Sequence, residues 1–197
     1  MALIIGLGNP GRRYEETRHN AGFLVADRLG DRWGAACARA QLGALVGTGL
    51  ISGVPVVLAK PQGFMNLSGQ PATSLKGYYK VELDQIIVIH DDLDLEFGTV
   101  RVKKGGGHGG HNGLRDLNQK IGSGFVRVRF GVSRPPEGWD AADYVLGKWS
   151  EGERAQLPDL VDLAADAVEA VLRDGAQQAM TTFNARQPQR HLSSMDA

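Results

Sequence analysis

Short apolar runs recur along the chain in the pattern expected of buried β-strands. The run Ile86–Ile89 is continuous and β-branched, which is typical of a strand buried on both faces. Ser52-Gly53 separates two such runs and predicts a β-hairpin. The predicted strands are Leu3–Ile5, Leu45–Ile51, Val54–Leu58, Ile86–Ile89, Val100–Lys103 and Val126–Val132.

Three other segments place apolar residues at helical spacing. The last of them follows a candidate capping box formed by Ser150 and Glu153, and Gly175 is a natural stop for it. Because strands and helices interleave, the expected fold class is α/β with a mixed, mostly buried sheet. The predicted helical segments are Asn20–Leu29, Leu67–Tyr79, for which Ser68 is a candidate N-cap, and Leu160–Leu172. A further helix that carries Arg115 and Lys120 is expected after the glycine-rich loop, which presents Asn112.

Composition narrows the class of protein without naming it. The 197 residues contain ordinary shares of apolar and charged side chains, which argues against disorder, and suit one domain. Cys37 is the single cysteine, so neither an intrachain disulfide nor a cysteine-based zinc site is expected. The chain contains no apolar run long enough to span a membrane, and the residues after Met1 lack the features of a signal peptide. We therefore expect a cytoplasmic protein.

The formal net charge of zero hides an uneven distribution. Residues 98–134 carry eight basic side chains against one acidic, whereas residues 135–197 carry five basic against eleven acidic. A basic stretch of this density is expected of a protein that binds a phosphate-rich partner, although a solvated face is the other interpretation. Arg127 and Arg129 alternate with apolar residues and so share one face of a predicted strand.

Glycine makes up 27 of the 197 residues, about twice its usual share. Nine of the 27 lie in Gly6–Gly11 and Gly105–Gly113, where we expect them to keep the backbone clear of a bound ligand. The spacing Gly6-x-Gly8-x-x-Gly11 after a strand also matches a dinucleotide-binding fingerprint. Pro10 and the charged residues that follow it do not suit that motif, so nicotinamide binding is the less favoured interpretation.

Candidate chemistry lies just beyond two predicted strands. His19 stands at the start of a predicted helix, and Asp91 follows the strand Ile86–Ile89 directly. Because residues at the carboxyl ends of neighbouring strands meet in one crevice, this pair predicts a general base oriented by a buried carboxylate. His108-x-x-His111 raises the alternative of a metal-dependent hydrolase, although glycine-rich backbone does not favour a helix through both histidines.

Three asparagines, Asn9, Asn66 and Asn112, occupy loop positions next to predicted elements. Their side-chain amides suit hydrogen bonding to ester and amide groups. Ser68 does not lie in a Gly-x-Ser-x-Gly sequence, so a serine nucleophile is not expected.

These motifs together resemble the bacterial-type peptidyl-tRNA hydrolase family. The resemblance runs from residue 3 to Val145-Leu146-Gly147-Lys148, and five motifs occur in the order that the family has. They are Gly6-Leu7-Gly8-Asn9-Pro10-Gly11 with Tyr14, Thr17-Arg18-His19-Asn20, Phe64-Met65-Asn66-Leu67-Ser68-Gly69, His90-Asp91-Asp92-Leu93-Asp94 and Gly105–Leu114.

The resemblance implies hydrolysis of the ester that joins a peptide to the 3′ ribose of tRNA, without a metal or cofactor. It implies that His19 accepts the proton, that Asp91 supports the basic form of His19, and that Asn9 helps to distinguish peptidyl from aminoacyl ends. It further implies that helices surround the sheet and that the protein is a monomer. The positions implied to contact the tRNA or the peptidyl end are Tyr14, Phe64, Asn66 and Asn112.

Sequence-independent binding of tRNA phosphates would suit an enzyme that accepts every tRNA. The expected organisation is a peptidyl-tRNA hydrolase domain over residues 1–186 with a frayed polar tail at 187–197. A relative that binds RNA without activity is a further alternative, which the presence of His19, Asp91 and all three asparagines argues against. The expected phosphate contacts are Arg101, Lys103, Arg127 and Arg129.

Overall fold

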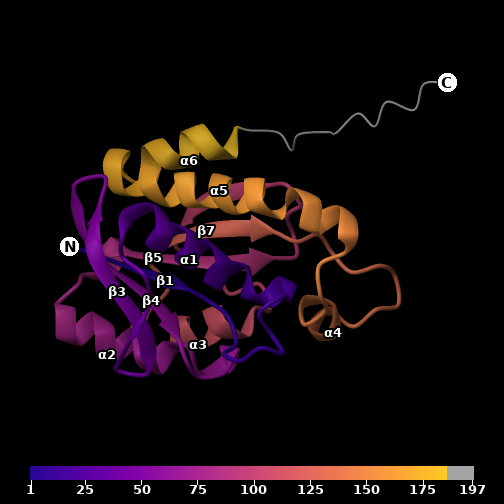
Figure 1. The fold of residues 1–197 in the computed structure, drawn as a ribbon, viewed down its shortest axis with the longest axis horizontal. Helices are drawn as coiled ribbons and strands as arrows, with labels where there is room; N and C mark the ends of the chain where they lie inside the picture. The colour runs from indigo at the N-terminus through magenta and orange to yellow at the C-terminus, as the bar shows by residue number, and fades with distance from the viewer. Residues whose placement is uncertain (186–197) are drawn as a thin grey trace.

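The computed structural model describes residues 1–185 and contains a seven-stranded mixed sheet with helices on both faces (Figure 1). The strands lie in the order β2-β3-β4-β1-β5-β7-β6. Their bounds are β1 Ala2–Gly6, β2 Arg39–Gln41, β3 Ala44–Ile51, β4 Val54–Pro61, β5 Ile86–Asp92, β6 Val100–Lys104 and β7 Val126–Gly131. The helices are α1 Ala21–Trp33, α2 Gly69–Tyr79, α3 Asn112–Ile121, α4 Ala141–Val145, α5 Glu151–Asp174 and α6 Ala176–Asn184, with 3₁₀ turns at Arg18–Asn20, Met65–Leu67 and Leu83–Gln85.

The centre of the sheet is parallel. Strand β1 pairs in parallel with β4 and β5, and β5 pairs in parallel with β7. The edges are antiparallel, with β2 and β3 on the β4 side and β6 on the β7 side. The carboxyl ends of β1, β4, β5 and β7 therefore meet at one edge of the sheet, where an open α/β fold binds its ligands.

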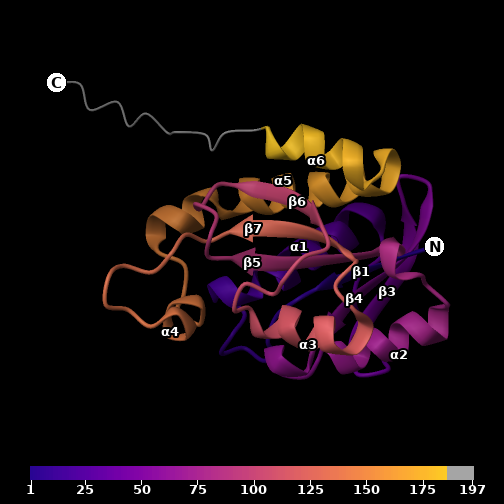
Figure 2. The same ribbon diagram turned by 180° about the vertical axis from the view of Figure 1, so that it is seen from behind.

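Two apolar cores cover the two faces of the sheet. Ile4 packs into one core with residues of α1, α5 and α6, whereas Leu3 and Ile5 pack into the other with residues of α2 and α3. The alternation follows from the strand period of two. Figure 2 shows the sheet between these two helical layers from behind. Helix α4 stands apart from both layers, beyond the ends toward which β5 and β7 point (Figure 1).

The α/β fold class with a mixed, largely buried sheet is confirmed, and so are the six predicted strands. The capping box of Ser150 and Glu153 begins α5, and Gly175 ends it. Ser68 precedes α2 as predicted, but the prediction that its side chain caps the helix is wrong. Its hydroxyl donates to the Met65 carbonyl, and Asp116 accepts the N–H of Gly69 instead.

The sequence interpretation missed three elements, the short strand β2 and the helices α4 and α6. Strand β2 and helix α4 have too few residues to show an apolar period. Helix α6 follows Gly175, which the sequence pattern indicates only as the end of the preceding helix. Within residues 1–185, no helix combines the length and the apolar character needed to cross a bilayer. The predicted polar tail from Gln187 lies outside the described residues.

Close approach between α1 and the strand ends requires glycine. A Cβ on Gly22 would lie 2.4 Å from both the Ile89 carbonyl oxygen and the Leu7 nitrogen, and one on Gly6 would lie 2.3 Å from the Gly22 carbonyl oxygen. A Cβ on Gly8 would overlap the Phe23 ring. The expectation that these glycines clear space for a ligand is thus wrong for Gly6 and Gly8. They let α1 pack tightly against the sheet, which fixes the turn that precedes the helix.

We expect Gly22→Ala to lower the free energy of unfolding by about 1–3 kcal/mol, because its methyl group overlaps backbone that cannot move away. Gly77→Ala in α2 is the matched control, because a Cβ there meets nothing within 4 Å. That variant should instead gain about 1 kcal/mol from helix propensity. Urea unfolding measures both, and a Gly22→Ala protein as stable as the wild type would contradict the close-packing role.

Candidate active site

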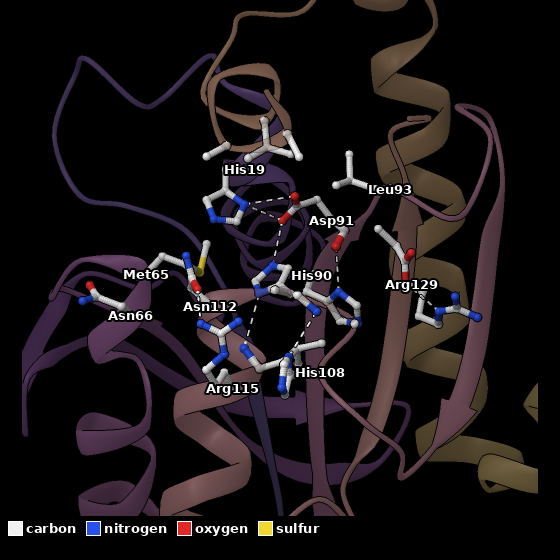
Figure 3. Close-up of a pocket in the computed structure, with 18 of the residues that line it drawn as sticks. His19, Met65, Asn66, His90, Asp91, Leu93, His108, Asn112, Arg115 and Arg129 are labelled. Carbon is white, nitrogen blue, oxygen red and sulfur yellow. Dashed lines mark hydrogen bonds and ion pairs between the residues drawn. The ribbon is translucent and has the colours of Figure 1, made fainter. Parts of the chain in front are cut away.

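A cleft of about 920 Å³ opens at the carboxyl edge of the sheet. Its walls come from the loops after β1, β4 and β5, the glycine-rich loop before α3, and helix α4. Figure 3 shows His19, Asp91 and His90 on one side of this cleft and Met65, Asn66 and Asn112 on another. Side chains from segments far apart in the sequence thus face one cavity.

His19 and Asp91, predicted as a base and its supporting carboxylate, are in direct contact. The Nδ1 atom of His19 lies 3.0 Å from each carboxylate oxygen of Asp91, and both residues are buried. An ionised carboxylate can only accept, so Nδ1 carries the proton and donates it. The lone pair of the neutral ring is then on Nε2, which points away from Asp91 (Figure 3).

The electrostatics of the pair favour a charged His19. Burial lowers the pKa of the His19 imidazole, but the charge of Asp91 and its hydrogen bond raise it by more, so the net pKa is above its ordinary value. Burial likewise raises the pKa of Asp91, whereas His19 and His111 lower it by more and hold it well below its usual range. Asp91 stays ionised at neutral pH and stabilises an imidazolium at His19.

His111 is a second donor to Asp91. Its Nδ1 accepts hydrogen bonds from the backbone N–H groups of Gly113 and Leu114 at 3.1 and 3.3 Å and so caps α3. Nδ1 therefore holds a lone pair, and the proton of the neutral ring is on Nε2, which lies 3.0 Å from Oδ1 of Asp91. Both histidine tautomers follow from their partners, and both direct a proton at Asp91.

His90 takes no part as a base. Its Nδ1 lies 2.7 Å from the Asp91 carbonyl oxygen and donates to it, while burial, together with His111, lowers the pKa of His90 to about 3. The ring is neutral at physiological pH. Its Nε2 is buried and has no partner within residues 1–185.

A metal site would need the same atoms. Ligand atoms of His19, Asp91 and His111 all lie within 4.8 Å of one another. A cation on Nε2 of His111 would force the remaining proton onto Nδ1, where it would oppose two backbone N–H groups and uncap α3. His108, the other histidine of the metal hypothesis, accepts the Gly110 N–H through Nδ1 outside this cluster. The donor chemistry therefore suits a proton network better than a metal.

Asn9 is held so that one group is left for a ligand. Its backbone N–H and carbonyl pair with the side-chain amide of Asn20 at 2.8 and 2.9 Å, and its Oδ1 accepts the Met65 N–H at 2.7 Å. The amide nitrogen Nδ2 has no partner in the described part of the chain, and Asn9 lines the cleft. Asn9 thus presents a fixed hydrogen-bond donor.

The other predicted contact residues line the same cleft. Tyr14 and Phe64 meet edge to face with ring centroids 6.4 Å apart, and Phe64 is mostly exposed. Asn66 is exposed, and the Oδ1 of Asn112 accepts from Arg115 at 3.0 Å, which leaves the Asn112 amide N–H groups for a ligand. An aromatic edge and two amide groups therefore surround the space in front of His19.

Comparison with known proteins identifies the family of the chain. The family model described as peptidyl-tRNA hydrolase matches residues 3–191. The chain belongs to the peptidyl-tRNA hydrolase family. A protein named peptidyl-tRNA hydrolase from Geobacter metallireducens is 51% identical over 92% of this chain and 94% of its own length, and one from Rhodococcus opacus is 49% identical over 93% and 97%. The crystal structure of peptidyl-tRNA hydrolase from Acinetobacter baumannii superposes with a TM-score of 0.89 at 39% identity, over 95% of this chain and 96% of that one.

Membership of the peptidyl-tRNA hydrolase family confirms the resemblance stated from the motifs and supports an enzyme of the hydrolase class. The roles of individual residues rest on the geometry alone. The structure brings together all seven predicted catalytic and substrate-contact residues in the cleft: His19, Asp91, Asn9, Tyr14, Phe64, Asn66 and Asn112.

The four basic residues expected to hold tRNA phosphates separate into two pairs. Lys103 and Arg129 line the cleft, and Arg129 is oriented by an ion pair of 2.8 Å between its Nε and Oδ2 of Asp92. Arg127 also borders the cleft but is buried, and its guanidinium donates to the carbonyl oxygens of Gly106 and Gly107. Arg101 donates to the Phe183 carbonyl of α6 at 3.0 Å. The geometry favours a phosphate contact at the first pair and a structural role for the second.

The sequence did not predict two features of the site. The sequence motif indicates His111 only as a candidate metal ligand, although a polar residue directly before a helix is a recognisable capping signal. Helix α4 contributes Ala141, Ala142 and Val145 to the wall of the cleft. Its small apolar side chains gave no signal of a site.

We expect Asp91→Asn to lower the pKa of His19, because burial then acts without a neighbouring charge to oppose it. Asp92→Asn is the control, since Asp92 pairs with Arg129 and does not contact His19. Titration of the histidine rings by NMR measures both. A His19 pKa that is the same in Asp91→Asn and wild type would show that the charge of Asp91 does not act on the base.

Proposed function

We propose that this chain hydrolyses the ester between a peptide and the 3′ ribose of tRNA, with His19 as general base. The observation that carries the proposal is the contact of His19 Nδ1 with a buried, ionised Asp91, which leaves Nε2 to accept a proton. The curated relatives at about 50% identity are named for this activity. The proposal covers cleavage without a cofactor.

The chemistry needs one proton to move twice. Water bound between Nε2 of His19 and the ester carbonyl transfers a proton to the ring as its oxygen attacks, and the imidazolium later returns the proton to the departing 3′ oxygen. Asp91 remains ionised throughout and stabilises the imidazolium. General base catalysis of this kind contributes about 10²–10⁴-fold in rate.

The attack places negative charge on the former carbonyl oxygen. Asn66 and Asn112 are the candidate donors to that oxyanion, because their amides border the cleft. Loss of one such donor typically costs about 3 kcal/mol of transition-state stabilisation. Tyr14 and Phe64 would contact the terminal nucleotide or the peptidyl end.

Asn9 suits the distinction between peptidyl and aminoacyl ends. A peptide bond next to the ester offers a carbonyl oxygen that can accept from Nδ2 of Asn9, whereas a free aminoacyl end offers an ammonium group, which is itself a donor. Two opposed donors cannot form a hydrogen bond. The backbone and Oδ1 contacts of Asn9 hold this donor in place.

Lys103 and Arg129 would bind phosphates of the tRNA, giving affinity that depends on salt and little on sequence. The complete proposal is a monomeric enzyme that acts in the cytoplasm on peptidyl-tRNA released prematurely from ribosomes. The ionised carboxylate buried between two histidines favours catalysis over RNA binding without turnover.

Release of peptide from N-blocked aminoacyl-tRNA tests the assignment of the base. His19→Ala should lose about 10²–10⁴-fold in turnover, and Asp91→Asn should lose less because the Asn side chain can still accept a hydrogen bond from Nδ1 of His19. Asp174→Asn, which removes a carboxylate paired with Arg173 at the end of α5 and away from the cleft, is the control and should stay close to wild type. If His19→Ala kept near-wild-type turnover, His19 would not be the base.

Salt dependence of the same assay tests the phosphate site. Arg129→Ala should raise KM at moderate salt with kcat nearly unchanged, and should reduce the slope of log affinity against log salt by about one. Arg28→Ala is the control, because Arg28 lies between α1 and α5 and pairs with Asp162. An Arg129→Ala variant with unchanged KM would remove Arg129 from the phosphate site.

A further inference from the structure

The residue directly before the proposed base is a buried arginine. Arg18 and His19 belong to the 3₁₀ turn Arg18–Asn20, and the side chains of this turn reach three different parts of the protein. His19 contacts Asp91 of β5, Asn20 pairs with the backbone of Asn9, and Arg18 extends to α4 and α5. The contacts of His19 and Asn20 belong to the site described above, whereas the contacts of Arg18 do not.

The guanidinium of Arg18 contacts a carboxylate, a backbone carbonyl and two aromatic rings. Its Nε and Nη2 donate to the two carboxylate oxygens of Glu153 at 3.2 and 2.7 Å, which is a bidentate pair. The guanidinium lies 4.4 Å from the centroid of the Tyr144 ring and 5.8 Å from that of Trp149. Its Nη1 donates to the Tyr144 carbonyl at 3.4 Å, and its backbone N–H donates to the Gly147 carbonyl at 3.1 Å.

The partners of Arg18 are fixed in turn. Glu153 accepts the backbone N–H of Ser150 at 2.6 Å as part of the capping box of α5. The Tyr144 hydroxyl donates to the Val132 carbonyl beyond the end of β7 at 2.7 Å. Arg18 therefore joins the turn that carries His19 to the start of α5 and to α4.

Helix α4 is a wall of the cleft as well as a partner of Arg18. Ala141, Ala142 and Val145 of this helix face the cavity, whereas Tyr144 of the same helix stacks on the guanidinium. The helix is short and packs into neither of the two helical layers (Figure 1). A displacement of Arg18 would thus move the proposed base and the α4 wall of the cleft together.

We infer that Arg18 is a positioning residue, which sets the placement of His19 against Asp91 and of the α4 wall against the cleft through its pair with Glu153 and its stacking on Tyr144. The inference rests on the proposed role of His19 as the base. Arg18 does not itself reach the reacting atoms, because its guanidinium is directed to α4 and α5.

Lysine cannot replace arginine in this role. A guanidinium is planar and can pair with two carboxylate oxygens while its face stacks on an aromatic ring, whereas an ammonium group is a point charge with neither geometry. Arg18→Lys retains the positive charge beside His19 and removes the fork and the stacking. This variant therefore distinguishes an effect of side-chain placement from an effect of the positive charge.

The matched control is Arg32→Lys. Arg32 also joins a helix to α5 through carboxylates, those of Asp162, Asp166 and Glu169, but on the face of the protein formed by α1 and α5. Both substitutions remove an arginine network that holds α5, and only one of the networks touches the turn with His19. Thermal unfolding of both variants defines the temperature at which each is folded and assayed.

For Arg18→Lys we expect kcat for peptide release to fall about tenfold, which is less than the roughly 10²-fold that a misplacement of 1 Å can cost. Arg32→Lys should stay within about twofold of wild type. Asp91 and His111 are the titratable groups that face His19. Because a looser contact with Asp91 weakens the stabilisation of the imidazolium, the acid limb of the pH–rate profile should move to lower pH in Arg18→Lys. A loss of stability alone would leave the profile in place.

Glu153→Gln is the second variant, since it keeps an acceptor for the Ser150 N–H while removing the charge that faces Arg18. Its kcat and pH profile should change in the same direction. Because the two residues act as one unit, kcat of the double variant should be no lower than that of the less active single variant. Wild-type kcat and an unmoved pH profile in folded Arg18→Lys or Glu153→Gln, with His19→Ala inactive, would overturn the inference alone. Activity in His19→Ala would remove the proposed base and the inference with it.

Discussion

The site depends on one buried negative charge. Asp91 is almost fully enclosed at the end of a central strand, where an unpaired carboxylate would be strongly unfavourable. Two histidine rings each donate a hydrogen bond to it, and these contacts settle which nitrogen of His19 and of His111 carries hydrogen. The proposed base, the cap of α3 and the ionisation of the carboxylate are thus a single electrostatic arrangement. The charge of Asp91 raises the pKa of His19, and the two histidines lower the pKa of Asp91.

The fold brings these groups together through the parallel centre of the sheet. Strands β1 and β5 are neighbours, so the loop after Gly6 and the strand end at Asp91 meet although 85 residues separate them in sequence. Helix α1 must then begin close to both strand ends, which the missing side chain of Gly22 permits. The turn Arg18–Asn20 connects these parts, because its three side chains contact Asp91 at the end of β5, the loop that contains Asn9, and helix α4.

The side chains of the basic stretch, residues 98–134, lie in two kinds of place. Arg127 supports the glycine-rich loop from inside, through the carbonyl oxygens of Gly106 and Gly107, and Arg101 reaches toward α6. Lys103 and Arg129 remain at the cleft, where a phosphate could approach them. Charge counted along the sequence therefore overstates the charge available to a partner, because part of it is used to fix loops and helices.

The sequence by itself determined six of the seven strands of the sheet, most of the helices, the family and the pairing of His19 with Asp91, because apolar periodicity and strand-end motifs are local signals. Only the tertiary structure decided the tautomer of His111, the contacts of Arg18 with Glu153 and Tyr144, and the place of α4 in the cleft wall. The physical reason is distance along the chain. Arg18 and Glu153 are 135 residues apart, and nothing in the local pattern of either residue identifies the other as its partner.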